Sequence, residues 1–184
     1  EKACRGLNPS LLNEYAWGST SIIEVTQISA PEDGTEIAIT TNANAHYQNN
    51  AITGGDGGVG PVRCGIFATP LTTTRDAAGA TYYGVMEMSG NLWEPCVSVR
   101  NETSTSGAVA FDGTPGDGNV NAGGLANVTG WPSVAGTTQG WIRRGGNFAT
   151  NTSGAVVLNL RVSDRAQLNW NGGRDQYTGG RGGR

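Results

Sequence analysis

The sequence is poor in the side chains that build most metal and catalytic sites. Only 15% of its 184 residues are charged, with a single lysine, Lys2, and a single histidine, His46. One histidine excludes sites built from several histidines and leaves one candidate base for a nucleophile. We interpret it as an ordinary loop residue. Cys4, Cys64 and Cys96 have no C-x-x-C spacing, so neither a structural zinc site nor a redox pair is indicated.

Long apolar runs are also missing. No segment approaches the ~18 consecutive apolar residues of a membrane-spanning helix, so we expect no membrane span. Residues 1–142 carry five Lys or Arg against thirteen Asp or Glu, whereas residues 143–184 carry seven Arg against two Asp. The basic end has too few aromatic side chains for a base-stacking platform. We therefore expect its arginines to pair with the acidic body, and we expect no nucleic-acid partner.

Glycine, by contrast, is abundant, at 30 residues. Each glycine inside a helix costs about 1 kcal/mol relative to alanine, so the composition favours a loop-rich β or α+β protein. Residues 1–6 are typical of a helix end, because Gly6 suits the left-handed cap and Lys2 and Arg5 suit the negative end of the helix dipole. A chain that opens on a helix end predicts a longer native protein. Partial alternation and β-branched residues predict short strands at 21–28 and 36–41. We also expect a strand at 61–68 and a buried strand at 155–162.

The most distinctive stretch is TYYGVMEMSGNLWEPCVSV, residues 81–99. Two apolar runs flank Ser89, Gly90 and Asn91, whose residue types favour a tight turn because Gly and Asn tolerate positive φ. Glu87 and Glu94 would lie about 10 Å apart along a straight helix, and a turn would bring them closer. Two interpretations stay open: the carboxylates and nearby carbonyls converge on calcium, or each carboxylate is solvated or paired with arginine. Spacing alone favours the second.

The same stretch, read as Y-G-x-x-E-M-x-G-N-L-W-E, resembles the G-L-x-D-M-x-G-N-V-W-E-W signature of the formylglycine-generating-enzyme (sulfatase-modifying factor) family. Three further stretches match this family in order: EKACRG with YAWGS near the start, WIRRGGNF at 141–148, and RVSDRA with a terminal GGRGGR. The resemblance implies a single domain over residues 1–184 with an α+β, C-type-lectin-like fold of short antiparallel strands and little helix. It also implies a structural calcium ion, held by the side chains of Glu87 and Glu94 and the carbonyls of Gly90 and Leu92.

The resemblance also bears on catalysis. Catalytic members of the family carry two cysteines after the G-G-S-F/Y turn, because thiolates both hold copper(I) and bind the substrate cysteine. Here the corresponding places fall at about Thr150 and Ala155, and neither side chain can do that chemistry. Fold resemblance cannot restore an activity whose ligands are absent. The resemblance therefore implies a non-catalytic member, with a formylglycine-generating oxidase as the weakest alternative.

We expect a recognition or adhesion domain that binds a protein or glycan, with a structural subunit of a surface or phage assembly as the main alternative. The same fold carries the ligand-binding regions of retroelement-diversified variable proteins, where changes concentrate between the R-G-G-x-W/F turn and the chain end. Scarce lysine and abundant Gly, Thr, Asn and Ser favour an extracellular, cell-surface or virion-surface location. The candidate ligand-binding residues in this window are Asn147, Phe148, Thr150, Asn151, Asn169, Trp170, Asn171, Asp175, Gln176 and Tyr177.

Overall fold

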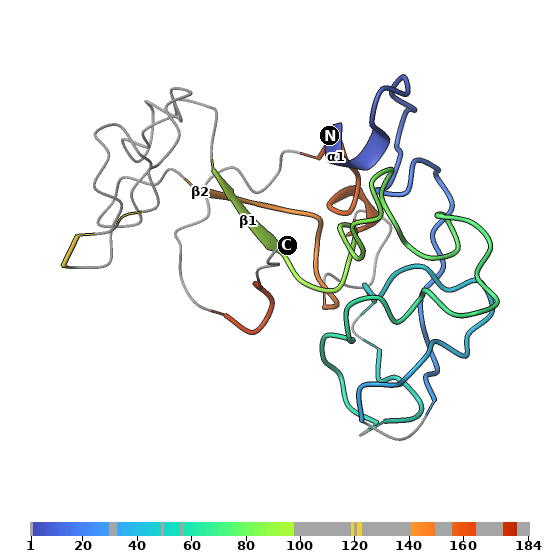
Figure 1. The fold of residues 1–184 in the computed structure, drawn as a ribbon. Helices are drawn as coiled ribbons and strands as arrows, with labels where there is room; N and C mark the ends of the chain where they lie inside the picture. The colour runs from blue at the N-terminus through green and yellow to red at the C-terminus, as the bar shows by residue number, and fades with distance from the viewer. Residues whose placement is uncertain are drawn as a thin grey trace. The chain divides into compact units, whose positions relative to one another are not determined.

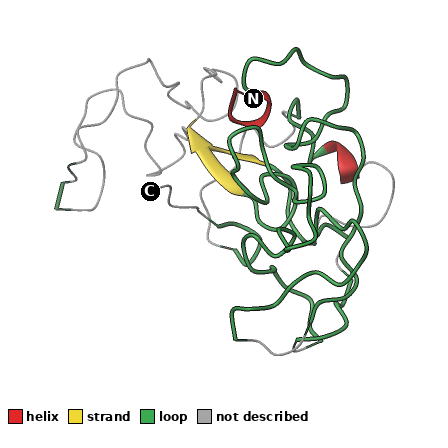
Figure 2. Cartoon of the chain, turned by 45° about the vertical axis from the view of Figure 1, so that its right-hand side comes forward, coloured by secondary structure: helices red, strands yellow, loops and turns green. Residues whose placement is uncertain are grey.

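Loops and turns make up most of the residues that the structure describes. The computed structural model describes residues 2–29, 33–48, 50–55, 57–97, 119, 121–122, 141–149, 156–164 and 175–179. Within them the regular elements are α1 (Lys2–Arg5), β1 (Glu94–Val97), β2 (Trp141–Arg144) and the 3-10 turn η1 (Val156–Leu158) (Figures 1 and 2). The structure is thus loop-rich with little helix. No described helix has the length and hydropathy that crossing a bilayer requires.

Two compact units divide the chain. The first comprises Glu1–Glu94, Arg144–Arg165 and Gln176–Arg184, and the second comprises Pro95–Arg143 and Ala166–Asp175. The prediction of one domain over residues 1–184 stays a prediction. So does the C-type-lectin-like fold, of which the described residues show the short strands and scarce helix only.

The short regular elements follow from local chemistry. Helix α1 ends where Gly6, at φ 61°, donates its N–H to the carbonyl of Lys2 at 2.8 Å, which confirms the predicted helix end. Strands β1 and β2 run side by side as a two-stranded antiparallel sheet (Figure 1). Pro95 lies within β1, and proline is tolerated there because both strands of such a sheet are edge strands.

None of the four predicted strands is present among the described residues. Residues 21–28 and 36–41 make single bridges only, among them Ile28 with Ala38. At two positions a side-chain oxygen takes the place of a strand partner, because the Thr40 hydroxyl accepts the backbone N–H groups of Thr26 and Gln27 at 2.9 and 3.0 Å. Such local bonds compete with strand ladders. Residues 61–68 form turns instead of a strand.

Residues 155–162, predicted as a buried strand, contain η1 instead. Burial itself is confirmed, since Leu160 and Val162 are 1% and 6% exposed. Their backbone groups bond singly to other segments: Val162 N–H donates to the carbonyl of Glu14 at 3.0 Å, and the carbonyl of Leu160 accepts from the Ser89 hydroxyl at 2.7 Å. A short apolar run shows burial and leaves the backbone conformation open.

The first unit has two apolar clusters. One gathers Tyr15 and Trp17 of the YAWGS motif with residues from the chain's start and end, and the other surrounds Val25, Ile66 and Phe67. Tyr15 and Trp17 are 4% and 1% exposed, so both aromatic side chains of the YAWGS motif belong to the core. The full first cluster comprises Cys4, Tyr15, Ala16, Trp17, Ala45, Tyr47, Leu160 and Val162.

Candidate functional site: the central turn and the segments it anchors

The turn at residues 89–91 is confirmed, with Gly90 at φ 92° and Asn91 at φ 64°. Its first residue, Ser89, is 1% exposed and joins two distant segments. The Ser89 hydroxyl accepts the N–H of Ala16 at 3.0 Å and donates to the carbonyl of Leu160 at 2.7 Å. The turn therefore connects an early segment of the chain to a late one.

Asn91 is bonded through every polar group it has. Its amide oxygen accepts the N–H of Val62 at 2.8 Å, and its amide nitrogen donates to the Val62 carbonyl at 2.9 Å. Its backbone N–H donates to the backbone carbonyl of His46 at 2.8 Å, and its carbonyl accepts the N–H of Phe148 at 2.7 Å. The Asn91 side chain thus takes the place of a neighbouring strand for Val62.

Two C-terminal segments are held beside this turn. Gly145 accepts the N–H of Gly90 at 2.7 Å, and Tyr177 accepts the N–H of Trp93 at 2.8 Å. The rings of Phe148 and Tyr177 then meet at 5.6 Å between centroids. Residues 145–149 and 176–179 are about thirty positions apart, and their bonds to the turn and to Trp93 bring them together.

His46 lies beneath this contact and is not the ordinary loop residue that the sequence suggested. It is fully buried, its ring stacks on Phe148 at 5.9 Å, and its Nδ1 lies 2.6 Å from Oε1 of Glu24. Glu24 also accepts the backbone N–H groups of Tyr47 and Gln48 at 2.7 and 3.3 Å. No described residue hydrogen-bonds to Nε2 of His46. Sequence reasoning missed this pair, because nothing in the spacing of Glu24 and His46 signals a contact.

Five of the ten candidate ligand-binding residues lie among the described residues. Asn147 and Phe148 are 6% and 4% exposed, so their side chains support the surface from beneath instead of forming it. Gln176 and Asp175 are exposed and Tyr177 is half-buried. In the second unit, Asp175 pairs with Arg143 at 3.0 Å. The other five, Thr150, Asn151, Asn169, Trp170 and Asn171, lie outside the described residues.

Two of the proposed calcium ligands, the backbone carbonyls of Gly90 and Leu92, have no hydrogen-bond donor among the described residues. By contrast, the carbonyls of the next residues in each case, Asn91 and Trp93, accept the N–H groups of Phe148 and Gly179. Backbone carbonyl oxygens are among the ligands that a hard cation takes.

The two carboxylates are placed differently. Glu87 is 1% exposed, has φ 51°, and accepts the N–H of Gly65 at 2.7 Å. Glu94 lies against Gly145, where a Cβ would stand 2.3 Å from its Oε2. No described cluster has three or more His, Cys, Asp or Glu side chains placed to hold a metal. A calcium site here would therefore combine two carboxylates with carbonyls and water, and it stays a prediction.

The three cysteines, all among the described residues, form no disulfide with one another. Cys4, Cys64 and Cys96 all retain thiols, and they are buried, exposed and half-buried respectively. Burial raises the pKa of the Cys4 thiol, which lowers its reactivity, because the thiolate is the nucleophile. The positions that correspond to the family's copper ligands, Thr150 and Ala155, lie outside the described residues.

Compared with models of protein families, with curated proteins and with solved structures, the chain gives no match in any of the three. The resemblance to the formylglycine-generating-enzyme family therefore rests on the four motifs named above.

Proposed function

We propose that this chain is a non-catalytic recognition or adhesion domain with a C-type-lectin-like scaffold, acting outside the cell or on a cell or virion surface. Its ligand, a protein or a glycan, meets a surface formed by the segments that follow β2 and that end at Tyr177. The observation that carries the proposal is the contact of Phe148 with Tyr177, because it joins two polar segments over a rigid support.

The physical basis is preorganisation. Binding costs less when the contact side chains are already ordered, and rigid aromatic rings beside adaptable polar groups are typical of recognition surfaces. The buried ring of Phe148 contacts the rings of His46 and of half-buried Tyr177. One C-terminal segment is bonded to the central turn, and the other is bonded to Trp93, two residues beyond it. Gln176, exposed beside Tyr177, is then free to differ between proteins without disturbing the core.

A sequencing survey of this locus across closely related isolates tests the proposal. We expect substitutions to concentrate at the exposed positions of residues 147–177, including Gln176, and to spare buried Phe148 and Asn91. Uniformly low variation would contradict a diversified surface and favour the structural-subunit alternative. A direct test uses arrays of glycans and of purified surface proteins. Gln176→Arg should abolish the strongest signal, whereas Gln27→Arg, at an exposed glutamine far along the chain, should preserve it.

Calcium is a second part of the proposal. Glu87 and Glu94 with the carbonyls of Gly90 and Leu92 would hold the ion, which would stiffen the turn that anchors both ligand segments. Added calcium should raise the melting temperature of the wild type, because a ligand that binds only the native state stabilises it. Glu94→Gln should remove this dependence. If the wild type has the same melting temperature in calcium and in chelator, the calcium proposal is contradicted, whereas the ligand proposal is unaffected.

A further inference from the structure

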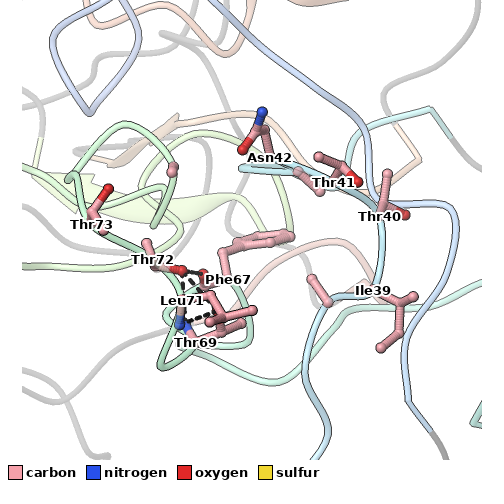
Figure 3. A pocket seen from close by; sticks show the side chains of 12 residues that line it. Ile39, Thr40, Thr41, Asn42, Phe67, Thr69, Leu71, Thr72 and Thr73 are labelled. Carbon is pink, nitrogen blue, oxygen red and sulfur yellow. Dashed lines mark hydrogen bonds between the residues drawn. The ribbon is translucent and has the colours of Figure 1, made fainter.

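A cavity of about 270 Å³ opens between residues 38–43 and residues 67–77 of the first unit, apart from the surface proposed above. Figure 3 shows Phe67 between two rims, with Thr41 and Asn42 along one rim and Thr73 on the other. Its volume lies just below the ~300–1,000 Å³ of pockets for drug-sized molecules. The size therefore suits a ligand as small as a single sugar ring.

The cavity has no charge. None of its twelve lining residues is Asp, Glu, Lys, Arg or His. A charged ligand would lose its hydration without gaining a counter-charge, which is costly. A neutral ligand meets no such penalty, so the lining selects against ions and for uncharged molecules.

Some of the lining hydroxyls are already engaged, and these hold the walls in place. Thr40 accepts the N–H groups of Thr26 and Gln27 at 2.9 and 3.0 Å. Thr69 and Thr72 bond to each other at 3.1 Å, and Thr72 also donates to the carbonyl of Phe67 at 2.9 Å. The dashed lines in Figure 3 follow this network around the turn at 69–72.

Other lining groups remain available. The side chains of Thr41, Asn42 and Thr73 are exposed and make no hydrogen bond to any described residue. Asn42 has φ 57°, a backbone conformation that Asn adopts more readily than most residues. Two hydroxyls and an amide on opposite rims offer donors and acceptors at the edges of a bound ring.

The rest of the cavity is apolar. Phe67, 2% exposed, belongs to the second core cluster and forms a rigid floor. Leu71 and Ile39 are 90% and 46% exposed, so they present large apolar surfaces to solvent beside the cavity. A bound molecule with one C–H face would cover this surface.

We infer that this cavity is a binding site for a neutral pyranose sugar, whose C–H face packs on Ile39 and Leu71 and whose hydroxyls bond to Thr41, Asn42 and Thr73. A pyranose ring has both an apolar face and a hydroxylated edge, and it carries no charge. The inference does not depend on the C-terminal ligand surface, since it uses different residues. A site for one ring should bind weakly, with a Kd of roughly millimolar order.

The test is an NMR titration of the ¹⁵N-labelled chain with glucose, galactose, mannose and their methyl glycosides, up to roughly 50 mM so as to saturate a millimolar site. We expect amide shifts confined to residues 38–43 and 67–77, and none with glucuronate. Binding of the methyl glycosides would assign the terminal ring of a glycan, and binding of the free sugars alone would assign a free monosaccharide. No shift in either segment, or equal shifts with glucuronate, would overturn the inference.

Variants give an independent readout. Thr73→Val keeps the shape of the side chain and removes its hydroxyl, and Asn42→Gly removes the amide at a φ that glycine favours. Each should weaken binding by roughly 2- to 10-fold, the effect of one net hydrogen bond. Thr20→Val, at an exposed threonine outside the cavity, should leave affinity unchanged. Wild-type affinity in both cavity variants would overturn the assigned contacts. The titration of the wild type decides the question if a variant does not fold.

Discussion

At the scale of single residues, the carboxylate of Glu24 is buried and has three partners. Glu24 is 7% exposed, and its oxygens contact Nδ1 of His46 and the backbone N–H groups of Tyr47 and Gln48. Glu24→Gln keeps its shape but replaces one acceptor oxygen by an NH₂ group that cannot accept. We expect a loss of about 1–3 kcal/mol in unfolding free energy, the cost of a buried polar group left unsatisfied. Urea unfolding measures this loss.

Asp33→Asn is the control for this carboxylate. Asp33 is exposed, and among the described residues its side chain bonds only to Thr35, two residues along the chain. Its replacement should change the unfolding free energy by less than about 1 kcal/mol. A Glu24→Gln variant as stable as Asp33→Asn would contradict the structural role assigned to the buried pair with His46.

Gly145 follows β2 at φ 88°, and an added Cβ would stand 2.3 Å from Oε2 of Glu94 and 2.8 Å from the Met88 carbonyl. Gly84, at φ 79°, has nothing within 4 Å of the same position. Both alanine variants meet the backbone strain of positive φ, about 1–2 kcal/mol, but only Gly145→Ala also meets a clash. Gly145→Ala should therefore be the less stable of the two in urea unfolding, and equal losses would contradict the close packing of Glu94 on this turn.

At the scale of elements, the turn at 89–91 organises more of the chain than any helix or strand among the described residues. Asn91→Asp preserves shape and tolerates the same φ, but it removes the donor to the Val62 carbonyl and buries a charge beside it. We expect a loss of at least about 2 kcal/mol, measured by urea unfolding. Asn13 has nearly the same φ, 65°, and its side chain makes no hydrogen bond to a described residue. Asn13→Asp should thus be nearly neutral, and equal effects at the two sites would contradict the proposed role of Asn91.

The elements that sequence predicted correctly are those whose signal is local. Gly6 at the helix end and Gly90 with Asn91 at the turn need positive φ, and few residue types supply it. The predicted strands failed because their backbone groups bond singly to several different segments. Some of their partners are side chains: Thr40 bonds residues 26 and 27, and Asn91 bonds Val62. Such pairings link positions 13 to 29 residues apart, so no local periodicity reveals them.

At the scale of the molecule, the candidate site was predictable only through motif resemblance. The resemblance singled out residues 147–177, and the structure brings Phe148 and Tyr177 of that window into contact. It gave no sign that Asn147 and Phe148 would be buried, nor that His46 would lie beneath them. The cavity at residues 38–77 was missed altogether, because scattered threonines and alanines carry no pattern until two loops face each other.

We expect the first apolar cluster to make the protein less stable as the pH becomes alkaline. Cys4, Tyr15 and Tyr47 all belong to this cluster, and in each case burial is the main cause that raises the pKa above its ordinary value. The unfolded chain ionises near the ordinary values of about 8.5 for Cys and 10 for Tyr, while the folded chain still holds these protons. The folded state then binds more protons than the unfolded state, so the unfolding free energy falls as pH rises.

Urea unfolding between roughly pH 7 and 11 should therefore show a plateau that ends above about pH 8.5, followed by a decline of at most ~1.4 kcal/mol per pH unit for each group. Tyr47→Phe should flatten the part of the decline above about pH 10, because it removes a buried phenol that resists ionisation. Tyr83→Phe, at a tyrosine that is 59% exposed, should leave the curve unchanged. A decline of equal slope above about pH 10 in both variants would contradict the contribution assigned to Tyr47.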